Sequence, residues 1–246
     1  MVSHTIFTPA ERRLIARLKT PILVQRFLNA LPYNTEPPPG RATLRSFREV
    51  VRRGTAHCLE AALTAAVILE QHGYPPLVLS FESLDELDHV IFVYRRGGRW
   101  GSVARSRDPG LHGRKAVFPN PRALALSYVD PYVDLTGRVL GYAVVDLRRL
   151  GEYDWRLART NIWKVERMLL EVPHRNLRTS DRRFRMLRAR YRAFKAAYPE
   201  RKPIDYQRRD RWTDIPEEFL RPRSEAAPQT AENKSGRGAS SLLGLI

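Results

Sequence analysis

The chain has 246 residues, 43% of them hydrophobic, and a formal net charge of +17. This length suits one domain of ordinary to large size with extensions. The only cysteine, Cys58, excludes a disulfide framework within the chain and a cysteine-ligated zinc site, and is typical of a reducing compartment. The sequence shows neither a secretory signal nor an apolar stretch of the ~18 residues that span a bilayer, so we expect a cytoplasmic protein. Its histidines lack metal-binding spacing, and no cofactor is expected.

The N-terminal region predicts helices. Thr8-Pro9-Ala10-Glu11 is a capping box with proline at the first helical position, so a helix is expected to start there. Thr20-Pro21 begins a second helix over residues 22–31. A short helix over 46–53 is expected to end at Gly54, after a loop over 34–40.

The middle of the chain predicts one long buried helix followed by strands. The helix runs from Cys58 to about residue 72, and its apolar residues cover a broad face. A strand is expected over 77–81, before an acidic loop over 82–88. Strands over 89–95 and 99–106 flank Gly97-Gly98, which is a strong hairpin signal. A loop over 108–113, a helix over 121–132 and a strand over 139–147 complete the expected core.

The C-terminal third is basic. Residues 148–223 hold 22 Lys/Arg against 11 Asp/Glu, and helices are expected over 155–170 and 181–198. Residues 224–246 lack an apolar pattern over most of their length and are expected to be a disordered tail. The predicted organisation is therefore a core domain with N-terminal helices over 1–150, a basic helical extension over 151–223 and a tail over 224–246.

Cys58 and His89 are the candidate catalytic pair. The first turn of a helix carries unpaired N–H groups and the positive end of the helix dipole, both of which favour thiolate over thiol. His89 opens a strand downstream, and cysteine at a helix start with histidine at a strand start is the arrangement of papain-like acyl-transfer chemistry. The alternative is that Cys58 is a small buried core residue.

Residues 32–132 resemble the transglutaminase-like superfamily of papain-like cysteine enzymes, in particular a poorly characterised bacterial branch. The matching features are Gly54-x-x-His57-Cys58 before an alanine-rich helix, Gly73-Tyr74-Pro75-Pro76 after it, Asp88-His89-Val90, Gly97-Gly98-x-Trp100-Gly101 and Pro109-Gly110-Leu111. The resemblance implies an α+β fold with a papain-like/transglutaminase-like core. In that core, the cysteine lies at the N-terminus of a buried helix packed on an antiparallel sheet, here with extra N- and C-terminal helices. It also implies that Cys58 is the nucleophile and His89 the general base and acid.

The third catalytic residue is not evident. The family places an acid four residues after a tryptophan, but Trp100 plus four is Ala104. If Gly97-Gly98 forms a two-residue turn, His89 faces Ser106 across the hairpin, and this hydroxyl could orient the imidazole. Asp108 is the next candidate. Both compete with the interpretation of Ser106 as an ordinary polar residue at a strand end.

Three functions stay open at this stage. The first is a cysteine-dependent acyl-transfer enzyme acting on a peptide or amide substrate, either a hydrolase or a transglutaminase, with an oxyanion hole built from the Cys58 N–H and one further donor. The second is a catalytically impaired binding module, which the alanine at position 104 favours. The third is a binder of nucleic acid or another anionic surface through the basic region. His57 is interpreted as a cap residue that could also lower the thiol pKa.

Overall fold

The computed structural model describes residues 6–36, 42–84, 89–133, 137–204 and 206–220. Its centre is an antiparallel sheet with strand order β4-β3-β2-β1-β5-β6. The strands are β1 (Leu77–Ser83), β2 (Val90–Arg96), β3 (Arg99–Val103), β4 (Arg114–Phe118), β5 (Val139–Asp146) and β6 (Arg175–Asn176). The helices are α1 (Pro9–Arg17), α2 (Pro21–Ala30), α3 (Phe47–Arg53), α4 (Cys58–Glu70), α5 (Pro121–Val129), α6 (Trp163–Glu171) and α7 (Asp181–Ala197). The predicted α+β class is confirmed.

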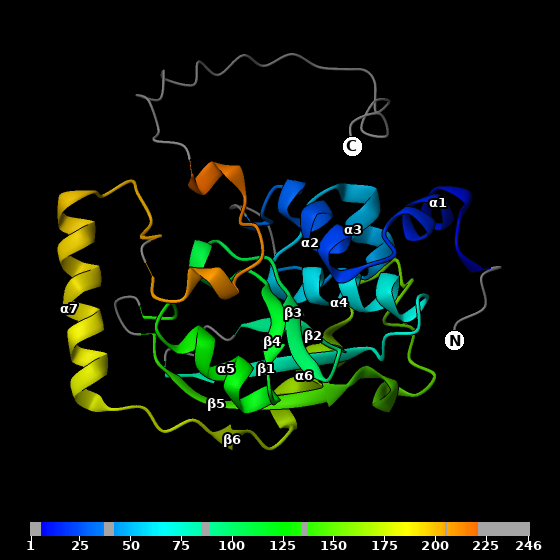
Figure 1. Cartoon of the computed structure of the whole chain (residues 1–246). Coiled ribbons are helices and arrows are strands. Elements are labelled where there is room, and N and C mark those ends of the chain that lie inside the picture. Colours follow the sequence, from blue (N-terminus) through cyan, green and yellow to red (C-terminus); the bar gives the residue numbers. More distant parts are fainter. Residues whose placement is uncertain (1–5, 37–41, 85–88, 134–136, 205, 221–246) are drawn as a thin grey trace, which may run out of the picture.

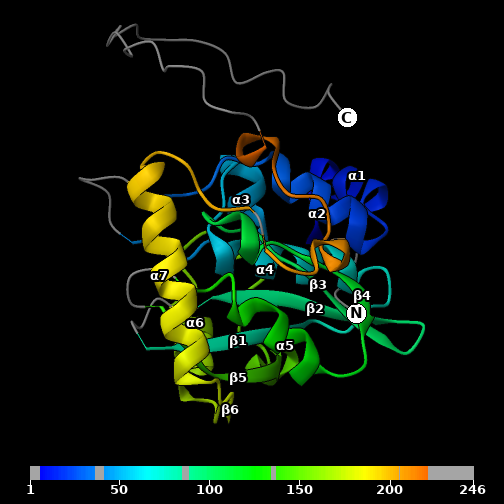
Figure 2. The same ribbon diagram turned by 60° about the vertical axis from the view of Figure 1, so that its left-hand side comes forward.

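Helices cover both faces of the sheet (Figures 1 and 2). On β2, Val90 and Phe92 belong to a hydrophobic cluster shared with α1 to α4, whereas Ile91 and Val93 belong to a second cluster shared with α5. This alternation follows from the two-residue period of a strand. Because β2 is apolar on both sides, it packs against both layers, and its N-terminal end lies where they meet.

The helix that carries Cys58 is the most buried helix of the fold. Every residue of α4 from Leu59 to Glu70 is buried. The helix packs on α2 and α3 on one side and on β1 and β2 on the other. A helix buried all round needs no amphipathic stripe, and its composition is accordingly rich in alanine and leucine. Cys58 is therefore fixed by a helix that cannot shift without disturbing the core.

The hairpin of β2 and β3 has the register expected for a two-residue turn at Gly97-Gly98. Both glycines have positive φ, 54° and 74°, which a type I′ turn requires. Val93 pairs with Ser102 and Arg96 with Arg99. The ladder ends at Phe92 and Val103, so the expected pairing of His89 with Ser106 lies beyond its end.

Two differences from the predicted elements concern the later chain. The strand over residues 114–118 was not expected; it is a short edge strand with a bulge opposite β3. The helix expected from residue 155 begins only at Trp163. The preceding segment is held away from helical geometry because Asn161 and Ile162 bond to the backbone of Leu44.

The predicted domain boundary at residue 150 stays a prediction. Trp155, Ile162 and Val165 belong to the same hydrophobic cluster as α4. The predicted tail over 224–246 lies outside the described residues. No helix in the described part of the chain has both the length and the apolar character needed to cross a membrane.

Candidate active site

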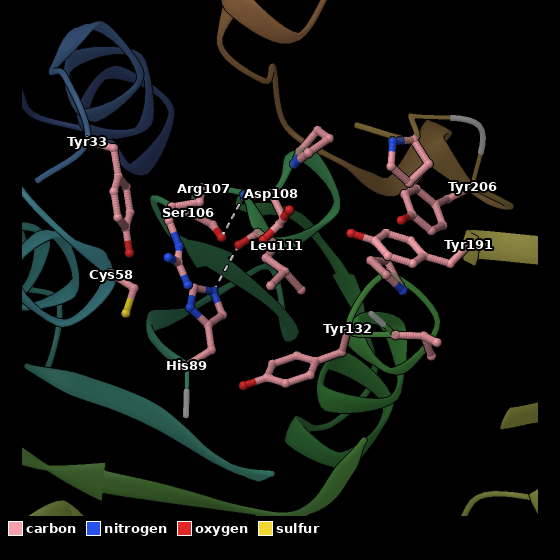
Figure 3. A pocket seen from close by; sticks show the side chains of 14 residues that line it. Tyr33, Cys58, His89, Ser106, Arg107, Asp108, Leu111, Tyr132, Tyr191 and Tyr206 are labelled. Atoms are coloured by element: carbon pink, nitrogen blue, oxygen red, sulfur yellow. Dashed lines mark hydrogen bonds between the residues drawn. The ribbon is translucent and has the colours of Figure 1, made fainter. Parts of the chain in front are cut away.

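Cys58 is the first residue of α4, and the loop before it is tightly held. Gly54 ends α3 with φ 68°, which is why a glycine stands there. Ala56 then forms a parallel bridge with Tyr33, while His57 is the N-cap of α4. The thiol is partly exposed and lines a cavity of about 80 Å³. Figure 3 shows Cys58 in this cavity between Tyr33 and His89.

Two histidines lower the pKa of Cys58. Burial alone would raise it, but hydrogen bonding and positive charge from His57 and His89 bring the pKa well below its ordinary value. The effect on His57 is reciprocal. Burial lowers its pKa, and the hydrogen bond and charge of Cys58, the charge of Glu60 and the carbonyl of Thr43 together raise it to about 9. Both shifts favour a thiolate at Cys58 beside an imidazolium at His57.

A backbone carbonyl orients His89. Nε2 of its imidazole lies 2.9 Å from the carbonyl oxygen of Leu111, and because a carbonyl only accepts, Nε2 must carry the proton. Phe81 stacks on the ring with a centroid distance of 6.2 Å and an interplanar angle of 10°, and His89 is only 4% exposed. Figure 3 shows the other ring nitrogen on the side of Cys58. This is the orientation that a proton carrier for the thiol requires.

The predicted orienting residues lie in the same cavity but have other hydrogen-bond partners. Cys58, His89, Ser106 and Asp108 all line it. The hydroxyl of Ser106 accepts a hydrogen bond from the Asp108 N–H at 3.1 Å, and the Asp108 carboxylate forms an ion pair with Lys202 at 2.6 Å. We expected Ser106 to hydrogen-bond to the His89 imidazole, but the Leu111 carbonyl makes this hydrogen bond instead. No side-chain motif in the sequence predicts a main-chain partner.

Ala104 occupies the position where the family resemblance implies an acid. Its backbone N–H donates to Gln25 Oε1 at 2.9 Å, and its carbonyl accepts from Gln25 Nε2 at 2.8 Å. Both residues are buried. The glutamine therefore fixes the chain beyond β3, and no carboxylate takes part at this point.

Tyr33 is a site residue that the sequence did not single out. Its hydroxyl lies beside Cys58, close enough for the backbone and the side chain of Cys58 both to act on the pKa of the phenol. Burial, followed by the charge of Cys58, raises the pKa of this phenol, so it stays protonated and remains a donor. The Arg107 charge acts on the same hydroxyl in the opposite direction. Tyr33 thus brings a second O–H or N–H donor to the region where the Cys58 N–H points.

Glu60 organises the polar groups beneath Cys58. It is fully buried one turn into α4. Its carboxylate accepts four hydrogen bonds of 3.0–3.1 Å, from Asn34 Nδ2, Thr43 Oγ1 and the backbone N–H groups of Arg45 and His57. It also lies 3.5 Å from Nε2 of His57. A buried carboxylate needs such partners, and here they hold the His57 imidazole between the carboxylate and the thiolate.

The C-terminal segment closes one side of the cavity. We call residues 199–204 and 206–220 the strap. Pro203 and Tyr206 of the strap and Tyr191 of α7 line the cavity opposite Cys58 (Figure 3). Ligand pockets usually measure roughly 300–1,000 Å³, so a cavity of about 80 Å³ admits little more than a small group. A larger substrate must displace the strap.

No group of three or more metal-ligating side chains suited to a metal ion occurs among the described residues. Arg107 and the Asp108–Lys202 pair bring charge to the mouth of the cavity, beside aromatic and proline side chains. This donor set suits acyl chemistry with a thiolate, a proton carrier and hydrogen-bond donors.

Comparison with known proteins finds similarity only at the level of solved structures. No protein-family profile and no curated protein matches this chain. The chain is similar to solved structures of Legionella pneumophila LapG, with 15% identity, 58% of this chain and 81% of that chain covered, and a TM-score of 0.36. The calcium-bound form of LapG has 17% identity, with 63% of this chain and 86% of that chain covered and a TM-score of 0.32. The EGTA-treated form has 16% identity, with 58% of this chain and 81% of that chain covered and a TM-score of 0.34. The similarity concerns the fold and is distant, so the function proposed below rests on the side chains of this chain.

Proposed function

We propose that this chain is a cysteine-dependent acyl-transfer enzyme in which Cys58 is the nucleophile and His89 the proton carrier. The observation that carries the proposal is the meeting of three features around Cys58, which with His89 lines the cavity. These are a thiol at the start of a buried helix, two imidazoles that lower its pKa, and a carbonyl that fixes the His89 tautomer. Buried structural cysteines lack such an electropositive, partly open environment.

The reaction that fits this geometry has two halves. The Cys58 thiolate attacks the carbonyl carbon of an amide or ester, and the C–N or C–O bond breaks as protonated His89 gives its proton to the leaving group. A thioester remains on Cys58. Water or an amine then attacks the thioester, His89 takes the proton of the attacking group, and the thiolate leaves. Whether water or an amine completes the reaction depends on what the cavity mouth admits.

The negative oxygen that forms in each half needs donors. The N–H of Cys58 at the helix N-terminus is one, and the Tyr33 hydroxyl beside it is the other in our proposal. Tyr33 lies beside Cys58 in the resting state, so it occupies part of this space and must turn its O–H toward the substrate oxygen. Removing one such donor typically lowers the rate by ~10²–10³-fold.

The pH dependence of Cys58 alkylation by iodoacetamide tests the proposal. Since Cys58 is the only cysteine, labelling reports on this thiol alone. We expect a midpoint well below the ordinary thiol value of ~8.5 in the wild type and a higher midpoint in His89→Ala. His72→Ala is the matched control, because His72 lies beyond the other end of α4 and bonds to Ile15. A slow, unperturbed thiol in all three proteins would favour the binding-module alternative. Trapping an acylated Cys58 with an activated ester, detected by mass, would confirm the first half-reaction.

A second candidate function is binding of nucleic acid through α7. The helix runs along one side of the molecule and has no buried residue (Figure 1). It carries seven basic side chains against one acidic residue, Asp181: Arg182, Arg183, Arg185, Arg188, Arg190, Arg192 and Lys195. Phosphate binding by such a row falls steeply with salt. Fluorescence anisotropy with a labelled oligonucleotide at 50 and 200 mM salt, for the wild type and an Arg185→Glu, Arg192→Glu variant, tests this function. Absence of binding at the lower salt concentration would remove it.

A further inference from the structure

Arg114 is a buried arginine whose hydrogen-bond partners are backbone carbonyls and the Ser127 hydroxyl. It is 0% exposed at the start of β4. Its guanidinium lies between two aromatic rings, 4.0 Å from the centroid of Tyr128 and 4.5 Å from that of Trp212. Among the described residues it has no salt bridge. Burying an unpaired guanidinium is costly, so its hydrogen bonds must have a structural or functional purpose.

Those hydrogen bonds hold the loop that orients His89. Nη2 donates to the Gly110 carbonyl at 2.6 Å and Nη1 to the His112 carbonyl at 2.8 Å. The carbonyl between them belongs to Leu111, and it receives the Nε2 proton of His89 at 2.9 Å. Of these three consecutive carbonyls, the outer two accept from Arg114 and the middle one from the imidazole, and the Tyr128 hydroxyl also donates to the His112 carbonyl. A planar fork of donors is suited to fixing two acceptors at once.

The strap covers this arrangement from the other side. Trp212 forms an antiparallel bridge with Arg114, and the N–H of Thr213 donates to the Gly113 carbonyl at 3.1 Å. Neither Trp212 nor Arg114 lines the Cys58 cavity. Their influence on the site must therefore pass through the loop over 110–113.

We propose that Arg114, held between Tyr128 and Trp212, is the positioning residue for His89, which it aligns through the Leu111 carbonyl. The proposal rests on the function proposed above, in which His89 serves Cys58. In it, an arginine and a backbone carbonyl do the orienting work that the family resemblance assigns to a carboxylate. The strap then takes part in building the active site, because the indole ring of Trp212 packs on the Arg114 guanidinium on the side opposite Tyr128.

The test compares Arg114→Met and Arg114→Lys with the wild type. Methionine keeps the length without donors, whereas lysine keeps the charge but not the planar fork. We expect the midpoint of Cys58 alkylation to rise in Arg114→Met, part of the way to its value in His89→Ala, and to rise less in Arg114→Lys. The ¹⁵N signals of His89, recorded at a pH where its imidazole is neutral, should show the proton no longer confined to Nε2 in Arg114→Met. This NMR signature reports ring orientation even if Cys58 proves non-catalytic, so failure of the proposed function and failure of this inference are distinguishable.

Arg156→Met is the matched control for a merely structural role. Arg156 also stacks on a tryptophan, at 4.2 Å from the Trp155 ring, and bonds to Glu70 at the far end of α4. Its loss should lower stability without moving the alkylation midpoint. If Arg114→Met does not fold, Trp212→Leu serves as the test variant, and we expect it to raise the pH midpoint of Cys58 alkylation as well. Wild-type midpoints and His89 signals in a folded Arg114→Met or Trp212→Leu protein would overturn the inference, as would an equal shift in Arg156→Met.

Discussion

Removing the thiol should release the proton that His57 holds. The pKa of His57 is raised from 6.5 to about 9 against the effect of burial, with Cys58 as the leading cause of the rise. At about 1.4 kcal/mol for each tenfold change in acid constant, this difference amounts to roughly 3 kcal/mol in favour of the imidazolium. In Cys58→Ala only Glu60 and the Thr43 carbonyl remain to oppose burial. We therefore expect the His57 pKa to fall below its value of about 9 in the wild type.

Imidazole NMR between pH 5 and 10 measures this change, with the His57 signal assigned by His57→Gln. Cys58→Ser should lower the midpoint as well, because a serine hydroxyl keeps a hydrogen-bonding group but does not ionise in this range. Thr64→Val is the matched control, since it alters the same helix about 9 Å further along its axis. An unchanged His57 midpoint in Cys58→Ala would refute the thiolate–imidazolium pair on which the proposed chemistry depends.

The sign of the stability effect follows from the direction of the shift. The folded pKa of His57 lies above the unfolded value, so its contribution to stability is complete below pH 6.5 and is lost as the pH rises to about 9. In Cys58→Ala this loss should still begin near pH 6.5, but it should be smaller and end at a lower pH. Urea unfolding at pH 6 and pH 9 tests the expectation. An equal pH dependence in both proteins would contradict it.

Three further predictions concern ion pairs and the buried carboxylate. Burial raises the pKa of Glu11, but Arg48 and a backbone N–H lower it further, so that it lies below 4.5 in the folded protein. Glu11→Gln should therefore lower the free energy of unfolding by roughly 1–3 kcal/mol at pH 7. In urea titrations, this difference from the wild type should vanish as the pH falls through the folded pKa. Glu60→Gln should cost ~3–5 kcal/mol and slow Cys58 alkylation at pH 6, because it leaves buried donors mismatched. Lys202→Ala breaks the ion pair with Asp108 and should speed labelling of Cys58 by a bulky maleimide more than by iodoacetamide, whereas the exposed-site control Lys19→Ala should not.

Local signals predicted the elements that carry the candidate catalytic pair. The capping box at Thr8 and Glu11 exists as expected, with the carboxylate 2.7 Å from the Thr8 N–H. The apolar run after Cys58 forms a buried helix, and the Gly-Gly turn sets the hairpin register. These features depend on residues near one another in the chain, so residue type and spacing are sufficient to predict them.

The parts of the site that sequence could not supply depend on tertiary structure. The orienting acceptor for His89 is the main-chain oxygen of Leu111, and every residue has a carbonyl, so no residue type identifies it. Tyr33 reaches Cys58 through a bridge to Ala56 that no local pattern predicts. The roles predicted for Cys58, His89 and Ser106 stay predictions, although the structure brings all three to one cavity.

The two histidines beside Cys58 are suited to different tasks, and their surroundings explain why. His89 lines the cavity and is fixed only by a neutral carbonyl, so it can release its proton to a leaving group and regain it. His57 lies outside the cavity lining, with Nε2 2.9 Å from the Thr43 carbonyl and 3.5 Å from the Glu60 carboxylate, which together favour its charged form. A neutral carbonyl stabilises the His89 imidazolium less than a carboxylate would. A second imidazole, whose pKa is raised to about 9, compensates by lowering the thiol pKa from the opposite side. The thiolate is then favoured at neutral pH without an acid at position 104, where the family resemblance implies one, provided that Glu60 balances the charge of His57.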